Sequence, residues 1–343
     1  MKKLLIISQI GSPDAPEAKS VGRYLKKFLM DARIIQAPFL IRWFLVNILI
    51  VPRRKNASAE KYHNIWTDQG SPLVLETEKF AKKLQSILNQ KNSEWIVCTH
   101  WRYGEETEIQ LEKIKNQYKD FSFSHVYLAP MYPQYAEATM LSALDVLKPA
   151  CQKLWSQAKL QVLKPFYNEP EFINSWVDKI RTRLALFDQV LFSFHGLPEA
   201  QVRKIQGCKL DSECCTRSDI SCCYPAQCQR TVQKIVASLG LKPEQYTLSY
   251  QSRVGPTKWL GPATDQVVQQ LVEQKQVRSL LVVCPAFVTD GLETLEEIDM
   301  ELRGQFKALG GVYFEMSPSL NDDSQWVSGF HSIMQRENSW REA

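Results

Sequence analysis

Two groups of side chains in this sequence have the types and the spacing that proton transfer and metal binding require. The first is a single histidine, His195, which follows the apolar run 190–194 and precedes a Gly-Leu-Pro turn. At the end of a buried strand, an imidazole is well placed to act as an acid, a base or a metal ligand. The alternative is a structural histidine with a satisfied ring. The position at a strand end favours the functional interpretation.

The second group is a pair of glutamates that follows the apolar run 280–287. Glu293 and Glu297 are four residues apart, so they share one face of the expected helix. Asp290 and Glu293 also fit a capping box, and the helix dipole favours acidic residues in a first turn. However, like charges at this spacing destabilise a plain surface helix, whereas a row of carboxylates can relay protons or bind a hard cation. The spacing alone leaves both interpretations open.

Cysteines form a third group. Six of the nine fall between residues 208 and 228, in a polar segment that burial alone cannot hold together. The candidate cross-links that could hold this segment together are disulfides, zinc or an iron–sulfur cluster. The first residues of the chain lack the long apolar run of a secretory signal, so we expect a cytoplasmic protein. In a reducing compartment, clustered cysteines more often bind a metal than form disulfides.

The elements that must position these residues alternate along the chain. Apolar or β-branched runs suited to buried parallel strands are separated by amphipathic stretches suited to helices. The strand-like runs are 4–8, 95–99, 126–130, 160–163, 190–194, 247–251, 280–286 and 312–315. The main helical stretches are 71–89, 105–119, 138–150, 171–187 and 292–309. This pattern predicts an α/β protein.

The strand pattern restarts near residues 155–165, which predicts two Rossmann-like, doubly wound domains with parallel sheets. The first domain is expected to comprise 1–158, with the C-terminal helix 318–343 packing back on it. The second is expected to comprise 159–317, including the cysteine-rich insertion 207–228. Such folds bind ligands outside the carboxyl ends of their strands, so we expect the site in the cleft between the domains.

Charge and motifs argue against two classes of function. A net charge of +5 is mild, and the one basic run is 52–55, so no nucleic-acid partner is expected. No Gly-x-Gly-x-x-Gly or Walker loop follows any expected strand, so no nucleotide cofactor is expected either.

The longest apolar stretch, 37–51, contains Arg42 and Asn47 and is too short and too polar to span a bilayer. Residues 38–46 nevertheless carry apolar side chains on every face of a helix. The stretch is either a buried helix or an exposed apolar lip that contacts a hydrophobic substrate or the membrane interface.

Three blocks of this sequence resemble the signatures of the ferrochelatase family. They are 191–198 (LFSFHGLP), 250–262 (YQSRVGPTKWLGP) and 284–297 (CPAFVTDGLETLEE). Shorter blocks at 11–14, 65–72, 101–104 and 130–135 resemble the family as well, so the resemblance spans nearly the whole chain. It implies insertion of Fe²⁺ into protoporphyrin IX to form protohaem, the final step of haem biosynthesis, by a porphyrin metal chelatase with two Rossmann-like domains.

The resemblance also implies roles for individual residues. His195 and Glu293 correspond to a catalytic pair on opposite walls of the site. Both residues are also expected to contact the iron, and the resemblance does not settle which of them is the base. Glu297 corresponds to the next acidic residue along a route for protons or iron. Contacts to the macrocycle are implied for Ile10, Arg102, Tyr103, Tyr132, Trp259 and Phe287. Among these, the cation of Arg102 is expected to meet a propionate.

Two positions depart from the family pattern. Gly291 stands where members commonly carry His or Cys, so a metal-ligating side chain is missing. Ile10 stands where coproporphyrin-type members carry Tyr, which favours protoporphyrin. Within the family, the segment 38–51 resembles an active-site lip, with peripheral membrane contact and with Arg53 and Arg54 facing propionates or lipid phosphates.

Some members of the family carry a [2Fe-2S] cluster, and the cysteine segment resembles the variety whose ligands lie in one short insertion. Side chains of adjacent cysteines diverge, so one cysteine from each adjacent pair and the two single ones make up the four ligands that a cluster needs. The expected ligands are Cys208, Cys215, Cys223 and Cys228, with Cys214 and Cys222 as alternates. Structural zinc is the alternative cofactor.

Overall fold

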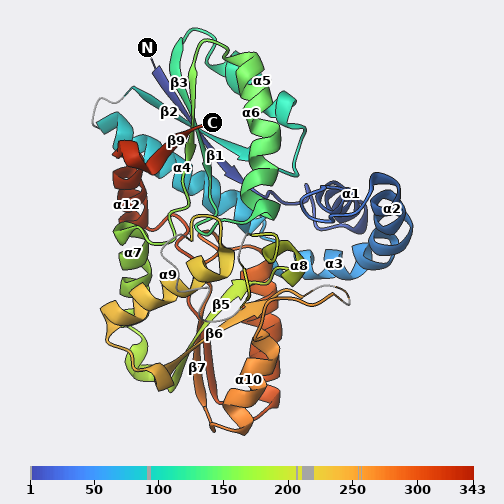
Figure 1. The fold of residues 1–343 in the computed structure, drawn as a ribbon, viewed down its shortest axis with the longest axis vertical. Coiled ribbons are helices and arrows are strands. Elements are labelled where there is room, and N and C mark those ends of the chain that lie inside the picture. Colours follow the sequence, from blue (N-terminus) through green and yellow to red (C-terminus); the bar gives the residue numbers. More distant parts are fainter. Residues whose placement is uncertain (1, 91–93, 206–207, 211–219, 254, 256) are drawn as a thin grey trace. The chain divides into compact units, whose positions relative to one another are not determined.

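The computed structural model describes residues 2–90, 94–205, 208–210, 220–253, 255 and 257–343. The chain divides into two compact units (Figure 1). One unit contains Met1–Tyr132, Ala136–Lys164 and Asn321–Ala343, and the other contains Pro133–Tyr135 and Pro165–Leu320. Each unit is built on its own sheet, and each is described by itself below.

The sheet of the first unit has the strand order β2-β1-β3-β4-β9. Its strands are β1 (Lys2–Gln9), β2 (Trp95–Trp101), β3 (Phe123–Pro130), β4 (Lys159–Leu163) and β9 (Trp340–Glu342). The first four are parallel, and β9 runs antiparallel to β4. The central run Leu4–Ile7 is fully buried, as expected for a parallel strand covered on both faces.

Helices cover both faces of this sheet (Figure 1). The helix α5 (Thr107–Gln117) packs beside α6 (Ser142–Leu154), which continues the π-helical turn η2 (Glu137–Leu141), while α4 (Pro72–Gln90) packs beside α12 (Ser324–Gln335). A helical arm is formed by α1 (Ala18–Leu29), α2 (Phe39–Phe44), the π-helical η1 (Leu45–Ile50) and α3 (Val51–Ile65). The 3₁₀ turn η7 (Glu337–Ser339) leads into β9.

The second unit has a four-stranded parallel sheet in the order β6-β5-β7-β8. Its strands are β5 (Gln189–His195), β6 (Tyr246–Gln251), β7 (Ser279–Val283) and β8 (Tyr313–Met316). Its helices are α7 (Pro170–Arg181), α8 (Glu199–Val202), α9 (Tyr224–Leu239), α10 (Thr264–Glu273), the π-helical η6 (Leu292–Leu302) and α11 (Arg303–Ala308), with 3₁₀ turns η3 (Leu184–Leu186) and η5 (Pro243–Gln245). Apolar side chains of β7, α10, η6 and α11 form one buried core.

The predicted α/β class with mainly parallel sheets is confirmed. The boundary between the units differs from the prediction, because β4 pairs in parallel with β3 from His125 to Leu128 and so belongs to the first sheet. The run 159–164 therefore lies in the first unit and not in the second. The C-terminal segment lies in the first unit too, and it adds the strand β9, which its sequence did not indicate.

Candidate active site

His195 is the last residue of β5 and lies beside Gln251, the last residue of β6, in the parallel register. Its Nδ1 is 2.6 Å from the carbonyl oxygen of Gly196. Because a carbonyl only accepts, Nδ1 carries a proton, and Nε2 is the ring nitrogen that can accept one. The backbone of His195 is also held, since the buried Tyr224 hydroxyl donates to its carbonyl oxygen at 2.8 Å.

Gly196 lets the ends of β5 and β6 approach closely. Its N–H donates to the carbonyl oxygen of Gln251 at 2.8 Å. A Cβ on Gly196 would lie 2.8 Å from that same oxygen and 3.3 Å from the ring of Trp259. The Phe287 ring lies 6.3 Å from that of His195, centroid to centroid. The structure thus brings two of the predicted macrocycle contacts next to the histidine.

The two glutamates lie on η6, one turn apart. The Glu297 carboxylate accepts the Ser252 N–H at 2.7 Å and the Ser252 hydroxyl at 2.6 Å. The side-chain amide of Gln251 donates to the carbonyl oxygen of Glu293 at 2.8 Å. Burial raises the pKa of the Glu297 carboxyl, and so does the charge of Glu293, while the Ser252 hydroxyl and the charge of His195 oppose that rise.

The capping-box interpretation of Glu293 is wrong. The helix begins at Leu292, and the residue that reaches back is Thr294, whose hydroxyl accepts the Gly291 N–H at 3.0 Å. The same hydroxyl donates to the buried Asp290 carboxylate at 2.9 Å, and Asp290 also accepts the Ser319 N–H. Capping therefore does not need the Glu293 side chain.

In the first unit, Arg102 and Tyr103 turn toward a buried polar cluster. Arg102 donates through Nη2 to Asp31 at 2.8 Å and through Nε to the carbonyl and hydroxyl oxygens of Ser142. The Tyr103 hydroxyl donates to Asp31 at 2.9 Å, and the Tyr103 N–H donates to the carbonyl oxygen of Ile10. The structure thus gives Arg102 a carboxylate partner within the protein, where a propionate was predicted. No sequence signal marked Asp31 or Ser142, because their partners are distant in the chain.

The predicted site residues divide between the units. Ile10, Arg102, Tyr103 and Tyr132 lie in the first unit, and His195, Trp259, Phe287, Glu293 and Glu297 lie in the second. Within the ranges that the structure describes, no three His, Cys, Asp or Glu side chains converge as a metal-binding group.

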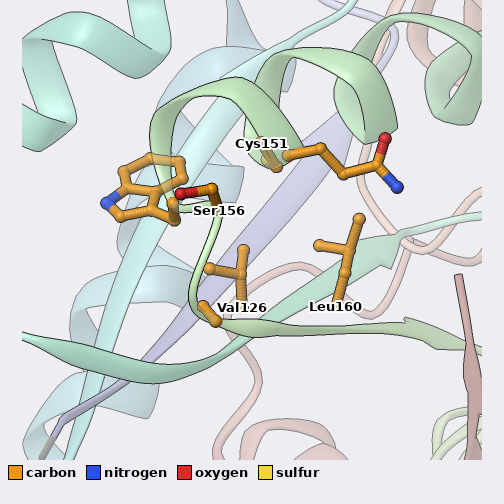
Figure 2. Close-up of a pocket in the computed structure, with 7 residues that line it drawn as sticks. Val126, Cys151, Ser156 and Leu160 are labelled. Carbon is orange, nitrogen blue, oxygen red and sulfur yellow. The ribbon is translucent and has the colours of Figure 1, made fainter.

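A cavity in the first unit is not the site. Figure 2 shows it between α6 and the strands, with Val126, Cys151, Ser156 and Leu160 around it. Its volume is about 90 Å³. Ligand pockets usually measure about 300–1,000 Å³. It is too small for a macrocycle, and it contains none of the predicted site residues.

Comparison with known proteins identifies the family. Residues 2–338 match the Ferrochelatase family model. The chain belongs to the ferrochelatase family. It is 38% identical over 337 residues to the ferrochelatase of Bdellovibrio bacteriovorus, covering 97% of this chain and 98% of that protein. It is 37% identical over 340 residues to the ferrochelatase of Ectopseudomonas mendocina, covering 97% of each.

The fold is also that of a chelatase. The structure of SirB from Bacillus subtilis with Fe³⁺ matches with a TM-score of 0.52, covering 98% of this chain and 95% of that one. At 12% sequence identity, this similarity concerns the fold alone.

The cysteine segment of this family member is described in part. Cys208 and Cys223 pack against the same small cluster, which includes Ile220 and Ala226. Cys223 is the N-cap of α9, and Cys228, five residues further along the chain, is fully buried. Cys222 is exposed. Cys214 and Cys215 lie outside the described residues. Among the residues that the structure describes, these cysteines do not form a group that could hold a metal ion, and the cluster stays a prediction.

Proposed function

We propose that this protein inserts Fe²⁺ into protoporphyrin IX to form protohaem, the final step of haem biosynthesis. The observation that carries the proposal is the match of residues 2–338 to the ferrochelatase family, in a chain where His195 lies beside Gln251 and Gln251 bonds to the backbone of Glu293. Metallation replaces two pyrrole protons by one Fe²⁺. The site must therefore accept protons and present a divalent ion to the ring.

We infer that residues of the second unit carry out these tasks. His195 presents a basic Nε2, because Nδ1 donates to Gly196. Glu293 supplies the second member of the catalytic pair. The pKa of Glu297 is raised by burial, which suits a carboxyl that takes up a proton and passes it on. Ile10 offers no hydroxyl to the ring metal, in keeping with protoporphyrin as the substrate.

Anaerobic turnover with Fe²⁺ tests the function. Purified protein should convert protoporphyrin to its iron complex, and His195→Ala should abolish that conversion. The matched control is the exposed His63→Ala, which should retain wild-type turnover. Absence of metalloporphyrin from both protoporphyrin and coproporphyrin would contradict the proposal. Turnover of coproporphyrin but not of protoporphyrin would mean that coproporphyrin is the substrate.

We further propose that Cys208, Cys215, Cys223 and Cys228 hold a [2Fe-2S] cluster. The contact of Cys208 and Cys223 with one apolar cluster supports this. The cluster would cross-link a polar segment that has little apolar surface to bury. Protein purified without oxygen should be red-brown, and Cys223→Ser should lose the colour while the buried Cys151→Ser keeps it. Colourless protein with stoichiometric zinc would favour the alternative.

We also propose a cytoplasmic protein that touches the membrane surface through residues 38–51. No helix in the described ranges is long and apolar enough to cross a membrane. Yet the large apolar side chains of this segment are 44–78% exposed, namely Phe39, Leu40, Ile41, Trp43, Phe44 and Ile48. An exposed apolar surface of this kind is typical of contact with a membrane interface, and haem is poorly soluble in water.

A further inference from the structure

Two consecutive residues at the end of β6 hold η6 by its backbone and by one of its carboxylates. Gln251 is the last residue of β6, the strand that lies beside β5, and Ser252 follows it (Figure 1). Gln251 donates to the backbone carbonyl of Glu293, and Ser252 donates twice to the carboxylate of Glu297. Neither residue has a role in the reaction so far described.

Hydrogen bonds at both the oxygen and the nitrogen of its side-chain amide fix the orientation of Gln251. Its Oε1 accepts the Ser193 hydroxyl of β5 at 2.7 Å and the Cys284 thiol, which follows β7, at 3.8 Å. Its Nε2 is thereby directed to Glu293. The side chain is 3% exposed, so water does not compete for these bonds. Through Gln251, the helix that carries the glutamates is attached to the sheet.

Ser252 adopts a left-handed backbone with a φ of +63°. This region is unfavourable for residues other than glycine and is found at sites where the surroundings enforce it. Here it directs the N–H to Oε1 of Glu297 and the hydroxyl to Oε2 of the same carboxylate. A standard extended residue would continue the strand and separate these two donors.

Two donors on one carboxylate restrict its rotation and leave its remaining lone pairs for other partners. A fixed carboxylate is the kind of oxygen ligand that a divalent cation prefers. Without the hydroxyl, Oε2 would lose its donor, and the group would rotate more freely.

We propose that Ser252 is a positioning residue for iron, which holds the Glu297 carboxylate in the orientation that receives Fe²⁺ before the ion enters the macrocycle. The inference rests on the proposed function. It assigns Ser252 to the metal and not to the porphyrin, and it requires that Ser252 act through Glu297. A purely structural role would change the stability of the fold and leave the balance between the two substrates unaltered.

The test compares Ser252→Ala with Ser252→Gly, and the matched control is Ser249→Ala. Glycine keeps the backbone N–H and tolerates the left-handed conformation, so it removes the hydroxyl without adding strain. Ser249 lies three residues before Ser252, on β6, and its hydroxyl bonds to Thr264 and not to a glutamate. In anaerobic steady-state kinetics, both Ser252 variants should raise KM for Fe²⁺ about tenfold, with KM for protoporphyrin unchanged. Ser249→Ala should leave both constants at the wild-type values.

A double-mutant cycle establishes the route of the effect. If Ser252 acts through Glu297, Ser252→Ala should add less than about twofold in the Glu297→Gln background. An unchanged KM for Fe²⁺ in Ser252→Gly would overturn the inference. So would a rise in KM for protoporphyrin, or a full tenfold effect that persists without Glu297. Wild-type protein without any turnover would instead overturn the proposed function, and this inference with it.

Discussion

The hydrogen bond from His195 to Gly196 decides what this imidazole can do. It fixes the proton on Nδ1 and leaves Nε2 as the acceptor, and it exists because the chain turns directly after β5. That turn needs the small residue at 196, since the carbonyl oxygen of Gln251 lies where a Cβ would be. The position of the histidine is therefore set by its neighbour as much as by its own side chain.

Gly196→Ala should lower turnover at least about tenfold, because the added methyl forces the ends of β5 and β6 apart at a cost of about 1–3 kcal/mol. Steady-state kinetics and thermal melting measure the two effects. The control is Gly304→Ala on α11, where a Cβ meets no atom within 4 Å and helix propensity favours alanine. Equal turnover in the two variants would contradict the importance of this close approach.

His100 makes stability depend on pH. It is buried between the Ser8 hydroxyl at 2.9 Å and the Thr107 hydroxyl at 3.0 Å, and burial, aided by the charge of Arg102, lowers its pKa to about 3. Above the unfolded pKa of about 6.5 both states are neutral, so this stability is fully present. As the pH falls below 6.5 only the unfolded state gains a proton, and stability is lost by about 1.4 kcal/mol per pH unit.

Urea unfolding at pH 7 and pH 5 checks this sign. His100→Gln should lose about 2 kcal/mol less than wild type between these pH values, whatever its stability at pH 7. The exposed His63→Gln should keep the wild-type dependence. The expectation fails if His100→Gln and wild type lose stability equally.

At the scale of elements, the helix of the two glutamates shows what a sequence pattern contains and what it lacks. The apolar pattern predicted a helix over 292–309, and the structure has η6 and α11 over 292–308. That η6 is π-helical follows from backbone hydrogen bonds, which the spacing of side chains does not reveal. Ser252 was missed for a related reason, because a left-handed φ at a non-glycine residue has no signature in the sequence.

Within the helical arm, α2 and η1 should bind lipid through their exposed apolar side chains. Replacing Phe39, Leu40 and Phe44 together by Ser should weaken binding to anionic vesicles at least about tenfold, since each removes apolar surface from the contact. Sedimentation with phosphatidylglycerol-containing vesicles measures it. The control replaces Ile109 and Phe121, which are 43% and 45% exposed elsewhere in the same unit. Equal loss of binding in the control would contradict a dedicated surface.

At the scale of the whole molecule, the chain leaves its first unit and returns to it at the end. The alternation of strands and helices predicted two parallel sheets, because it depends only on local periodicity. It could not assign β4 to a sheet, since a short strand of five residues fits either sheet equally well. The pairing of β9 with β4 was equally beyond local patterns, because Leu163 and Trp340 are separated by about half of the chain.

Because the C-terminal segment belongs to the first unit, the stability of that unit should depend on this segment. Trp326 on α12 is fully buried against Phe80 of α4, and Trp176 on α7 is a fully buried tryptophan of the second unit. Truncating either to Ala should cost about 3–5 kcal/mol. In hydrogen exchange, Trp326→Ala should expose amides of β1 and β3 while β5 and β7 stay protected, and Trp176→Ala should do the reverse. Faster exchange in β5 and β7 upon Trp326→Ala would mean that the two units unfold as one, because Trp326 and its ring partners Phe80 and Phe330 belong to the first unit.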